Sequence, residues 1–269
     1  MKVAVTGASG FVGQAVLRIL TTTDGIDLTK FDRSSHNLLD SESLKDFVES
    51  QDAIIHLAGV NRGTNRELFE TNALGILGLL DAVVKFSPPT RVVFASSFQV
   101  YLPQSLYGLL KKFAEDLLVQ YGLNHNIKST ILRLSNVYGP EGRPFYNSVV
   151  ATFAHLIKEG QPLKINGDGS SERDYVYVED IASAFIEAAT YDQREVTKII
   201  DICSGKQTTL NTVVEYLGKI SGKKVEVEYN RNVVDNPWPT KDKNPSRAKE
   251  ILGWEPETTL EEGLKKVME

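Results

Sequence analysis

The sequence predicts an α/β fold in which a doubly wound parallel sheet is joined to a smaller C-terminal α/β lobe. Three observations predict it. Strand-like and helix-like segments alternate from the start of the 269-residue chain, a glycine-rich turn joins the first strand to the first helix, and the chain becomes loop-rich after about residue 140. Such alternation indicates a parallel sheet with helices on both faces.

The elements of the first lobe follow from apolar spacing and from apolar runs that end at turn residues. KVAVT is a short apolar strand, and the next segment carries apolar residues at the helical spacing 11, 12, 15, 16, 19 and 20. The runs DAIIHLAG and RVVFASS are apolar enough to be buried on both faces. The predicted elements are strand 2–6, helix 10–22, strand 26–31, strand 52–59, helix 66–86, strand 91–97, a helix from about residue 105, and strand 126–137.

The link after the second strand is unusual. Between Asp32 and Asp40 there are too few residues for a helical crossover, which takes about a dozen or more. Either HNLLD (36–40) is a vestigial edge strand reached by a loop, or the usual crossover helix is absent. We favour the edge strand.

A cluster of turn-forming residues at 139–144 marks the point after which the sequence becomes loop-rich. After it, KIIDIC (198–203), VEVEY (225–229) and a terminal helix over 256–269 are expected to pack as small elements beside the main sheet. We predict a first domain, residues 1–140, whose sheet is partly completed by later segments, and a second lobe, residues 141–269.

The composition argues against several classes of protein. The net charge of −5 and the pI near 5.5 disfavour a nucleic-acid or membrane-surface binder, which needs a basic face. One cysteine, Cys203, leaves no intrachain disulfide or cysteine-based zinc cluster and fits a reducing cytoplasm. The four histidines lack metal-ligand spacing, so no metal site is expected. No segment approaches 18 apolar residues and no signal peptide is recognisable, so we expect a cytoplasmic protein without a membrane span.

The glycine-rich turn VAVTGASGFVG places Gly7, Gly10 and Gly13 between the first strand and the first helix. Glycines there permit a tight turn, let the backbone touch a pyrophosphate, and let helix and strand pack closely. The N–H groups and positive dipole end of the helix then face the anion. The alternative is a glycine-rich turn without a ligand.

Asp32 ends the second strand, 19 residues after Gly13. A carboxylate at that place hydrogen-bonds the adenosine ribose hydroxyls and repels a 2′-phosphate. Strand, loop, helix, strand and acid in this order predict a Rossmann dinucleotide site, so residues 1–140 are an NAD(P)-binding domain. We favour NAD. Arg33 follows at once and can pair with a 2′-phosphate, which keeps NADP as the alternative.

Tyr107 and Lys111 lie four residues apart in SLYGLLKKFAEDL, so a helix would place them on one face. An ammonium beside a phenol favours the phenolate and lowers its pKa, which makes a base for a sugar or alcohol hydroxyl. The alternative is a core tyrosine beside a solvated lysine.

Ser96 and Ser97 end the strand 91–97, where the strands of a doubly wound sheet line the ligand crevice. A serine there can donate to a substrate oxygen, or it can simply cap the next turn. Downstream of the nucleotide loop, Ser97, Tyr107 and Lys111 together predict a catalytic site.

The order TGASGFVG, HLAG (56–59), SS (96–97), YGLLK (107–111), LRLSNVYGP (132–140) and RDYVYVEDIA (173–182) resembles the extended short-chain dehydrogenase/reductase family. Within it, the chain is similar to the NAD-dependent epimerase/dehydratase branch that acts on nucleotide sugars. The likeness continues to ILGWEPETTLEEGL (251–264).

The resemblance implies roles for particular residues. Tyr107 would be the acid/base, Lys111 would lower its pKa and hold the nicotinamide ribose, Ser97 would bind the reacting substrate oxygen, and Asn72 would support the site. The implied cofactor contacts are Gly7, Ser9, Gly10, Phe11, Val12, Gly13, Asp32, Arg33, Asn37, Leu38, Leu57, Ala58 and Gly59, together with Tyr107 and Lys111.

The resemblance also implies substrate contacts, with Asn136 and Asn147 on the sugar or phosphate and Arg173 on the diphosphate, which suits bidentate recognition. Arg231 would be a second basic contact. The alternative for Arg173 is a salt bridge to Glu172 or Asp174.

The implied activity is transfer of hydride at carbon 4 of a UDP- or dTDP-linked hexose, and we favour a 4-epimerase. The alternatives are a 4-ketoreductase of the dTDP-4-keto-6-deoxyhexose type and a non-catalytic dinucleotide-binding regulator. A dehydratase is not expected, because Phe98-Gln99 stand where those enzymes carry Asp-Glu. The family further implies a homodimer through the helices 74–86 and 109–121, whose apolar faces could equally be ordinary core.

Overall fold

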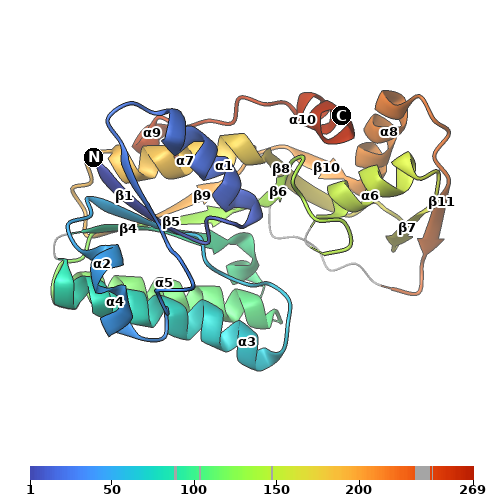
Figure 1. Ribbon diagram of the computed structural model, residues 1–269. Helices are drawn as coiled ribbons and strands as arrows, with labels where there is room; N and C mark the ends of the chain where they lie inside the picture. Colours follow the sequence, from blue (N-terminus) through green and yellow to red (C-terminus); the bar gives the residue numbers. More distant parts are fainter. Residues whose placement is uncertain (88–89, 103, 147, 234–242, 244) are drawn as a thin grey trace. The chain divides into compact units, whose positions relative to one another are not determined.

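The computed structural model describes residues 1–87, 90–102, 104–146, 148–233, 243 and 245–269. The chain forms two compact units, each made of several segments (Figure 1). Unit 1 comprises Met1–Leu134, Ala182–Ile202 and Arg247–Trp254, and unit 2 comprises Ser135–Ile181, Cys203–Ser246 and Glu255–Glu269. The division of function between residues 1–140 and 141–269 stays a prediction.

Unit 1 is built on a six-stranded sheet in the order β2-β1-β3-β4-β5-β9, and every neighbouring pair is parallel. This confirms the predicted parallel sheet. The strands are β1 Lys2–Thr6, β2 Asp27–Lys30, β3 Ala53–His56, β4 Arg91–Ser97, β5 Ser129–Leu134 and β9 Thr197–Ile202.

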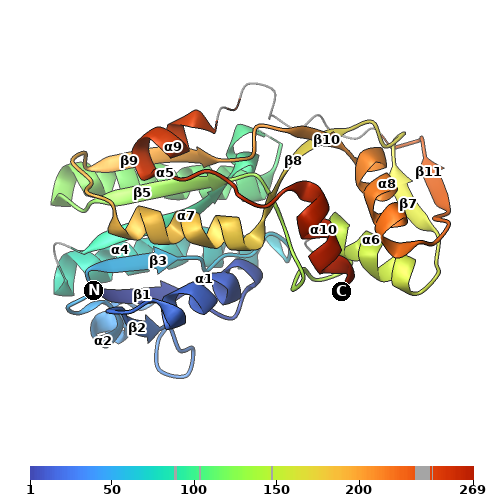
Figure 2. The ribbon, with the colours of Figure 1, turned by 90° about the horizontal axis from the view of Figure 1, so that it is seen from above.

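Helices cover both faces of this sheet: α4 and α5 lie on one face, and α1 and α7 lie on the other (Figures 1 and 2). The strands between them are buried, as their apolar content predicts; all four residues of β3 are inaccessible or nearly so. The helices are α1 Phe11–Thr22, α2 Lys45–Val48, α3 Asn65–Phe69, α4 Gly75–Phe86, α5 Leu106–His125, α7 Val178–Thr190, which begins in unit 2, and α9 Ser246–Leu252.

The predicted helix 66–86 is helical throughout, but its middle is a π-helical segment, η2, Glu70–Leu74, between α3 and α4. A π-helical turn inserts an extra residue into the helix and frequently marks a functional site. Here the segment carries Asn72, which is buried.

Helix α5 begins and ends at residues whose chemistry sets its limits. The hydroxyl of Ser105 accepts a hydrogen bond from the Gly108 N–H, which is a standard N-cap. At the other end Asn126 adopts the left-handed conformation, with φ 57°. Tyr107 and Lys111 therefore lie in the first two turns of a 20-residue helix.

The predicted edge strand at 36–40 is wrong. Residues 33–40 form turns, followed by a 3₁₀ turn, η1, Ser41–Leu44, and the short helix α2. The Asn37 side chain accepts from the Leu39 N–H, and Ser43 bonds the backbone of Asn37 on both sides. These local bonds hold the backbone in turns, which compete with strand pairing.

The expectation that 198–203 packs beside the main sheet is also wrong. Residues 197–202 are β9, which pairs in parallel with β5 along its whole length and forms one edge of the sheet. The expectation that later segments partly complete the sheet agrees with this pairing.

The described residues of unit 2 form a three-stranded sheet, β10-β8-β6, a two-stranded parallel sheet, β11-β7, and the helices α6, α8 and α10. The helices pack on an apolar core in which Gly263 lies against the ring of Tyr138, a contact that leaves no room for a Cβ atom. The elements are β6 Asn136–Tyr138, α6 Val149–Lys158, β7 Leu163–Asn166, β8 Glu172–Tyr177, β10 Gln207–Thr209, α8 Leu210–Ser221, β11 Val227–Asn230 and α10 Leu260–Met268.

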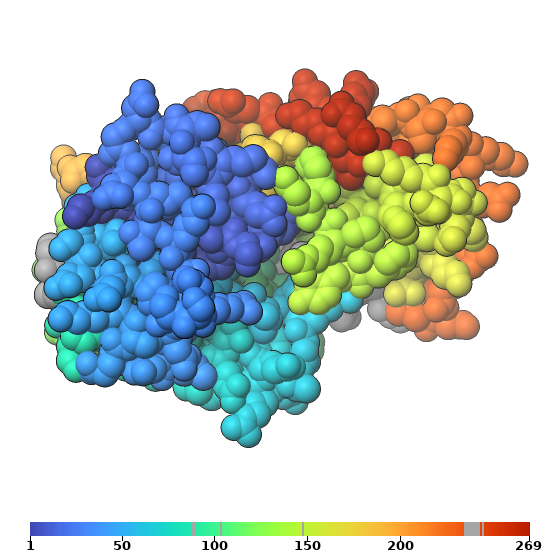
Figure 3. All heavy atoms as spheres, viewed as in Figure 1, coloured from blue at the N-terminus to red at the C-terminus, as the bar shows by residue number. Residues whose placement is uncertain are grey.

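In the space-filling view, blue and cyan atoms from the first ninety residues form most of the visible surface of unit 1, and yellow-green and orange atoms of later segments form that of unit 2 (Figure 3). Within the described residues, none of the helices has the length and apolar character needed to cross a membrane.

Candidate active site

The glycine loop lies between β1 and α1, as predicted, and its glycines are required by sterics. Gly7 has φ +68°, and a Cβ on it would lie 2.6 Å from the Ala58 nitrogen. A Cβ on Gly13 would lie 2.2 Å from the Gly7 oxygen. Helix α1 starts after Gly10 without a side-chain cap, so its first N–H groups remain for a ligand anion. Ser9, Phe11 and Val12 lie in the same turn and are exposed or partly exposed.

Asp32 follows the carboxyl end of β2, which pairs with β1, so it lies next to the strand that feeds the glycine loop. Its carboxylate accepts hydrogen bonds from the N–H and hydroxyl of Ser34, at 2.9 and 2.7 Å, and these bonds lower its pKa. Asp32 and Arg33 are exposed, and so is Asn37, while Leu38 packs partly against the core. The carboxylate is thus ionised and fixed in orientation.

Several predicted residues lie just beyond the end of β3. Leu57 and Ala58 pack against Gly7, where an added Cβ would lie 2.7 Å from the Leu57 carbonyl carbon and 2.6 Å from the Ala58 nitrogen. A Cβ on Gly59 would lie 3.0 Å from the Asn72 oxygen and 3.1 Å from the Lys111 ammonium nitrogen. Asn72 in turn bonds the backbone of Val60 on both sides, at 3.2 and 2.7 Å. The structure therefore brings Gly59, Asn72 and Lys111 into one place.

Lys111 is 3% exposed, so its charge is largely removed from water. The ammonium donates to the Ala95 carbonyl at 2.9 Å and lies 4.6 Å from the centre of the Phe94 ring. Burial lowers the pKa of Lys111 to about 8, against an opposing contribution from the carboxylate of Glu115. Lys111 is therefore not the solvated lysine of the structural alternative.

Tyr107 lies over Lys111, whose nitrogen is 5.8 Å from the ring centre. Its ring packs on a small cluster formed by Leu68, Ala73 and Leu110. Burial raises the pKa of Tyr107 to about 12, which is opposite to the lowering expected from the spacing with Lys111. The expectation was wrong because the sequence pattern shows the neighbouring charge but not the loss of hydration.

Ser97 ends β4 and takes the structural role weighed above: its hydroxyl oxygen accepts from the Gln99 N–H at 3.2 Å and caps the 3₁₀ turn η3, Phe98–Tyr101. This bond uses a lone pair and leaves the hydroxyl proton for another acceptor. The cap and the predicted substrate contact are therefore compatible.

In unit 2, the predicted substrate residues Asn136 and Arg173 lie on the neighbouring strands β6 and β8. Asn136 donates to the Asp174 carbonyl at 3.3 Å. Arg173 donates to the Ser171 hydroxyl and to the Glu172 carbonyl. The carboxylate of Asp174, which was considered as a salt-bridge partner of Arg173, accepts hydrogen bonds from the Ser135 hydroxyl and from the N–H groups of Ser204 and Gly205.

The other two predicted substrate residues are less informative. Asn147 lies outside the described residues. Arg231 follows β11, is exposed, and its charge helps to lower the pKa of Asp168. Among residues that the structure describes, no group of three or more His, Cys, Asp and Glu side chains is arranged to hold a metal ion.

Several buried polar residues around the site were not predicted. Thr6 and His56 are both buried, and the Thr6 hydroxyl lies 2.9 Å from Nδ1 of His56 and accepts from the Ala58 N–H. Glu115 is fully buried one helical turn after Lys111, and Arg133 is the one charged residue of β5. An acid four residues after Lys111, and a lone arginine in an apolar strand, were the signals available in the sequence.

Comparisons with known proteins agree with this geometry. The profile of the NAD dependent epimerase/dehydratase family matches residues 3–203. A UDP-glucuronate 4-epimerase of Thermodesulfobacterium geofontis is 31% identical over 98% of the chain and 94% of that protein. A UDP-2-acetamido-2,6-beta-L-arabino-hexul-4-ose reductase of Pseudomonas aeruginosa is 38% identical over 70% of the chain and 49% of that protein. The structure is similar to a crystal structure of Thermotoga maritima UDP-glucose 4-epimerase with UDP-glucose, with a TM-score of 0.87 and 27% sequence identity. The match covers 100% of this chain and 97% of the Thermotoga maritima chain.

Proposed function

The chain belongs to the NAD dependent epimerase/dehydratase family, and we propose from this that it is a nucleotide-sugar 4-epimerase that uses NAD. The observation that carries the proposal is the meeting of Tyr107, Lys111 and Gly59 beyond the strand ends of a Rossmann sheet. The similarity to a UDP-glucuronate 4-epimerase over 98% of the chain supports the choice of reaction.

The residues of unit 1 fit NAD. A Cβ atom on Gly7 or Gly13 would collide with neighbouring backbone atoms, so only glycine fits at these positions. The N–H groups at the start of α1 carry no side-chain cap. In our proposal these groups bind the pyrophosphate, Asp32 binds the adenosine ribose, and Lys111 binds the nicotinamide ribose. When bound, NAD supplies the acceptor and donor of hydride for carbon 4.

Tyr107 moves the proton. The phenolate takes the proton of the 4-hydroxyl as carbon 4 loses hydride, and the phenol returns it when hydride comes back to the opposite face of the turned 4-keto sugar. Burial raises the pKa of Tyr107 to about 12, so neighbouring positive charge is needed to form the phenolate. The Lys111 ammonium and the positive charge of oxidised nicotinamide both favour it. Ser97 donates its hydroxyl proton to the same substrate oxygen.

The substrate in our proposal is a UDP-hexose or UDP-hexuronate. Arg173 lies on β8, which pairs with the strand β6 that carries Asn136. A guanidinium recognises a diphosphate through paired, charge-assisted hydrogen bonds. Support for the uridine nucleotide comes from the named relatives, whose substrates are UDP-sugars.

The proposed enzyme acts as a homodimer in the cytoplasm. Helix α5 exposes Leu109, Phe113 and Leu123, at 54, 45 and 70%, and α3 exposes Phe69. Large apolar side chains gathered in this way are typical of an interface between chains. Cys203, the single cysteine of the sequence, is buried, which fits a reducing compartment.

The test is incubation of the purified protein with UDP-glucose or UDP-glucuronate, with separation of the epimers and simultaneous reading of nicotinamide absorbance. We expect interconversion without net change of absorbance. Tyr107→Phe should retain NAD and lose at least about a hundredfold in turnover, the scale of a general acid/base. Tyr216→Phe is the matched control, because its ring lies 6.0 Å from the Lys219 nitrogen in unit 2.

The second candidate, a 4-ketoreductase, is favoured by the 38% identity to the Pseudomonas aeruginosa reductase. It would consume one reduced cofactor for each 4-keto sugar supplied. Net oxidation of reduced cofactor with a 4-keto sugar, and no interconversion of the parent sugars, would replace the epimerase proposal.

A further inference from the structure

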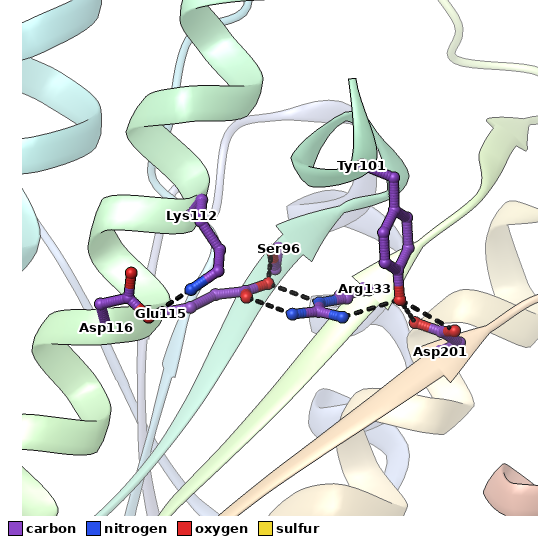
Figure 4. A network of polar contacts seen from close by, with 7 residues as sticks. All are labelled: Ser96, Tyr101, Lys112, Glu115, Asp116, Arg133 and Asp201. Atoms are coloured by element: carbon purple, nitrogen blue, oxygen red, sulfur yellow. Dashed lines mark hydrogen bonds and ion pairs between the residues drawn. The ribbon is translucent and has the colours of Figure 1, made fainter. Parts of the chain in front are cut away.

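A network of buried and partly buried polar side chains lies in unit 1 and reaches helix α5 at Glu115, one turn after Lys111 (Figure 4). None of its members was needed for the proposed mechanism. Glu115 of α5 accepts from Arg133 of β5 through both carboxylate oxygens, at 2.8 and 2.6 Å. The Ser96 hydroxyl of β4 donates to the same carboxylate at 2.5 Å. Arg133 also donates to the Tyr101 oxygen at 2.7 Å, and Tyr101 donates to Asp201 of β9 at 2.9 Å.

The charges of the network are held in place by pairing. The side chains of Glu115 and Arg133 are 1 and 15% exposed, and their contact is a bidentate carboxylate–guanidinium pair. Such pairing offsets part of the cost of removing both groups from water. The guanidinium also lies 4.9 Å from the centre of the Tyr101 ring, which restrains it from one face.

The network joins the two segments that carry the predicted catalytic groups. Helix α5 bears Tyr107 and Lys111, and the turn η3, which contains Tyr101, is capped by Ser97. Through Glu115 and Tyr101, respectively, both segments are tied to Arg133. One guanidinium therefore links the helix to the turn, in addition to the direct hydrogen bond between Ser105 and Gln99.

Glu115 also acts on Lys111 through space, because the two residues lie four apart on one helix face. The titratable groups that face Lys111 are Tyr107 and Glu115 from its own helix and His56 from β3. Burial and the nearby Lys111 lower the pKa of His56 to about 3, so this imidazole is neutral at ordinary pH. The carboxylate of Glu115 is thus the negative charge that favours the ammonium form of Lys111.

We infer that Glu115 and Arg133 are positioning residues of the reaction: Glu115 keeps Lys111 charged, and Arg133 holds the Tyr107 helix and the Ser97 turn in register. The inference rests on the proposed function for its kinetic readout. The effect of the Glu115 charge on Lys111 can be measured without any sugar substrate.

Glu115→Gln is the first test, because glutamine keeps the size of the side chain and can still bond Ser96 and Arg133, but has no charge. Without the carboxylate, the ammonium of Lys111 is less favoured, so its pKa should fall by at least about 0.5 unit. The ¹³Cε resonance of Lys111, assigned with Lys111→Arg, reports this pKa directly. The alkaline limit of turnover should move to lower pH by the same amount, while the Michaelis constant of the sugar changes less than twofold.

Asp116→Asn is the matched control. Asp116 follows Glu115 on the same helix, but it is exposed and pairs with Lys112. Removing its charge should leave the titration of Lys111 and the pH profile of turnover in place.

Tyr101→Phe tests the other half, since it cuts the link from Arg133 to Asp201 and leaves the Glu115 charge in place. We expect turnover to fall about tenfold at every pH, with no shift of the alkaline limit.

The inference is overturned if folded Glu115→Gln leaves the Lys111 titration unchanged, or if Tyr101→Phe turns over normally. If Glu115→Gln does not fold, Tyr101→Phe decides. Absence of activity in the parent protein would refute the proposed function alone, because the resonance of Lys111 is measured without substrate.

Discussion

At the scale of single residues, the environment of Tyr107 is set by Leu68 and Ala73, which come from a distant segment and bury its ring. The four-residue interval placed Tyr107 over Lys111, and the glycine interval placed Gly7 and Gly13 where a Cβ would collide. The pKa of Tyr107 moved the other way from the expectation because of this burial. Long-range burial of this kind leaves no mark in a local pattern.

Asp32→Ala should weaken NAD binding about tenfold or more and narrow the difference between NAD and NADP. The carboxylate is ionised, fixed by Ser34, and placed after β2, so its loss removes both the ribose bond and the repulsion of a 2′-phosphate. Calorimetric titration with each dinucleotide measures the effect, with Asp27→Asn at the first residue of β2 as the control. A parent protein that already prefers NADP would make Arg33 the determinant instead.

At the scale of elements, β4 was predicted to the residue at 91–97. The predicted strand 52–59 is shorter, at 53–56, and the predicted strand 126–137 is two strands, β5 at 129–134 and β6 at 136–138. The failures have local causes. Residues 36–40 became turns because Asn37 and Ser43 bond nearby backbone groups, and the π-helical segment around Asn72 was missed because one extra residue barely disturbs a helical pattern. The register of β9 beside β5 has no local signal, and the lone arginine of an apolar strand does not identify Glu115 as its partner.

The contact between α5 and η3 gives an element-level prediction. A Cβ on Gly108, next to Tyr107, would lie 2.0 Å from the Gln99 carbonyl oxygen. Because this neighbour is backbone, Gly108→Ala must push η3 away from the helix, at a cost of about 1–3 kcal/mol in the free energy of unfolding. Turnover should fall with it, while NAD binding at the glycine loop is retained.

Gly75→Ala serves as the control, because a Cβ on this helical glycine of α4 would have its nearest neighbour at 3.6 Å. It should be neutral or should stabilise the protein by up to about 1 kcal/mol. Equal unfolding free energies for both variants, measured by urea denaturation, would contradict the steric argument.

At the scale of the whole molecule, the sequence predicted the parallel sheet and the second lobe but not how the chain is shared between the units. The chain passes from one unit to the other after Leu134, Ile181, Ile202, Ser246 and Trp254. Which strand completes a sheet is decided by pairing between distant segments, and residues 197–202 read locally as a small separate element. A single domain boundary near residue 140 therefore cannot describe two units that are each made of several segments.

The global stability of the protein should depend on the protonation of one buried histidine. Burial, with Lys111 nearby, lowers the pKa of His56 to about 3 from 6.5. The unfolded chain then binds this proton more readily than the folded protein, so the stabilisation is complete above about pH 6.5 and is lost as the pH falls toward 3. The free energy of unfolding should fall by up to about 1.4 kcal/mol per pH unit in this window.

Urea denaturation between pH 7 and pH 5 measures that slope. His56→Gln should flatten it, because glutamine can still bond the Thr6 hydroxyl but does not titrate. The exposed His125→Gln should keep the parent slope. Parallel slopes in all three proteins would assign the pH dependence to other groups.

The discontinuous make-up of unit 1 has a consequence for synthesis on the ribosome. Strand β5 is translated well before β9, its partner along the sheet edge, and 68 residues separate Leu134 from Ile202. At about 5–20 residues per second, the growing polypeptide spends roughly 3–14 s with that edge of β5 unpaired. An unpaired strand edge is a template for association with other chains. The nascent protein therefore depends during this interval on dilution or on chaperones, and slow codons between residues 135 and 202 should lower the soluble yield.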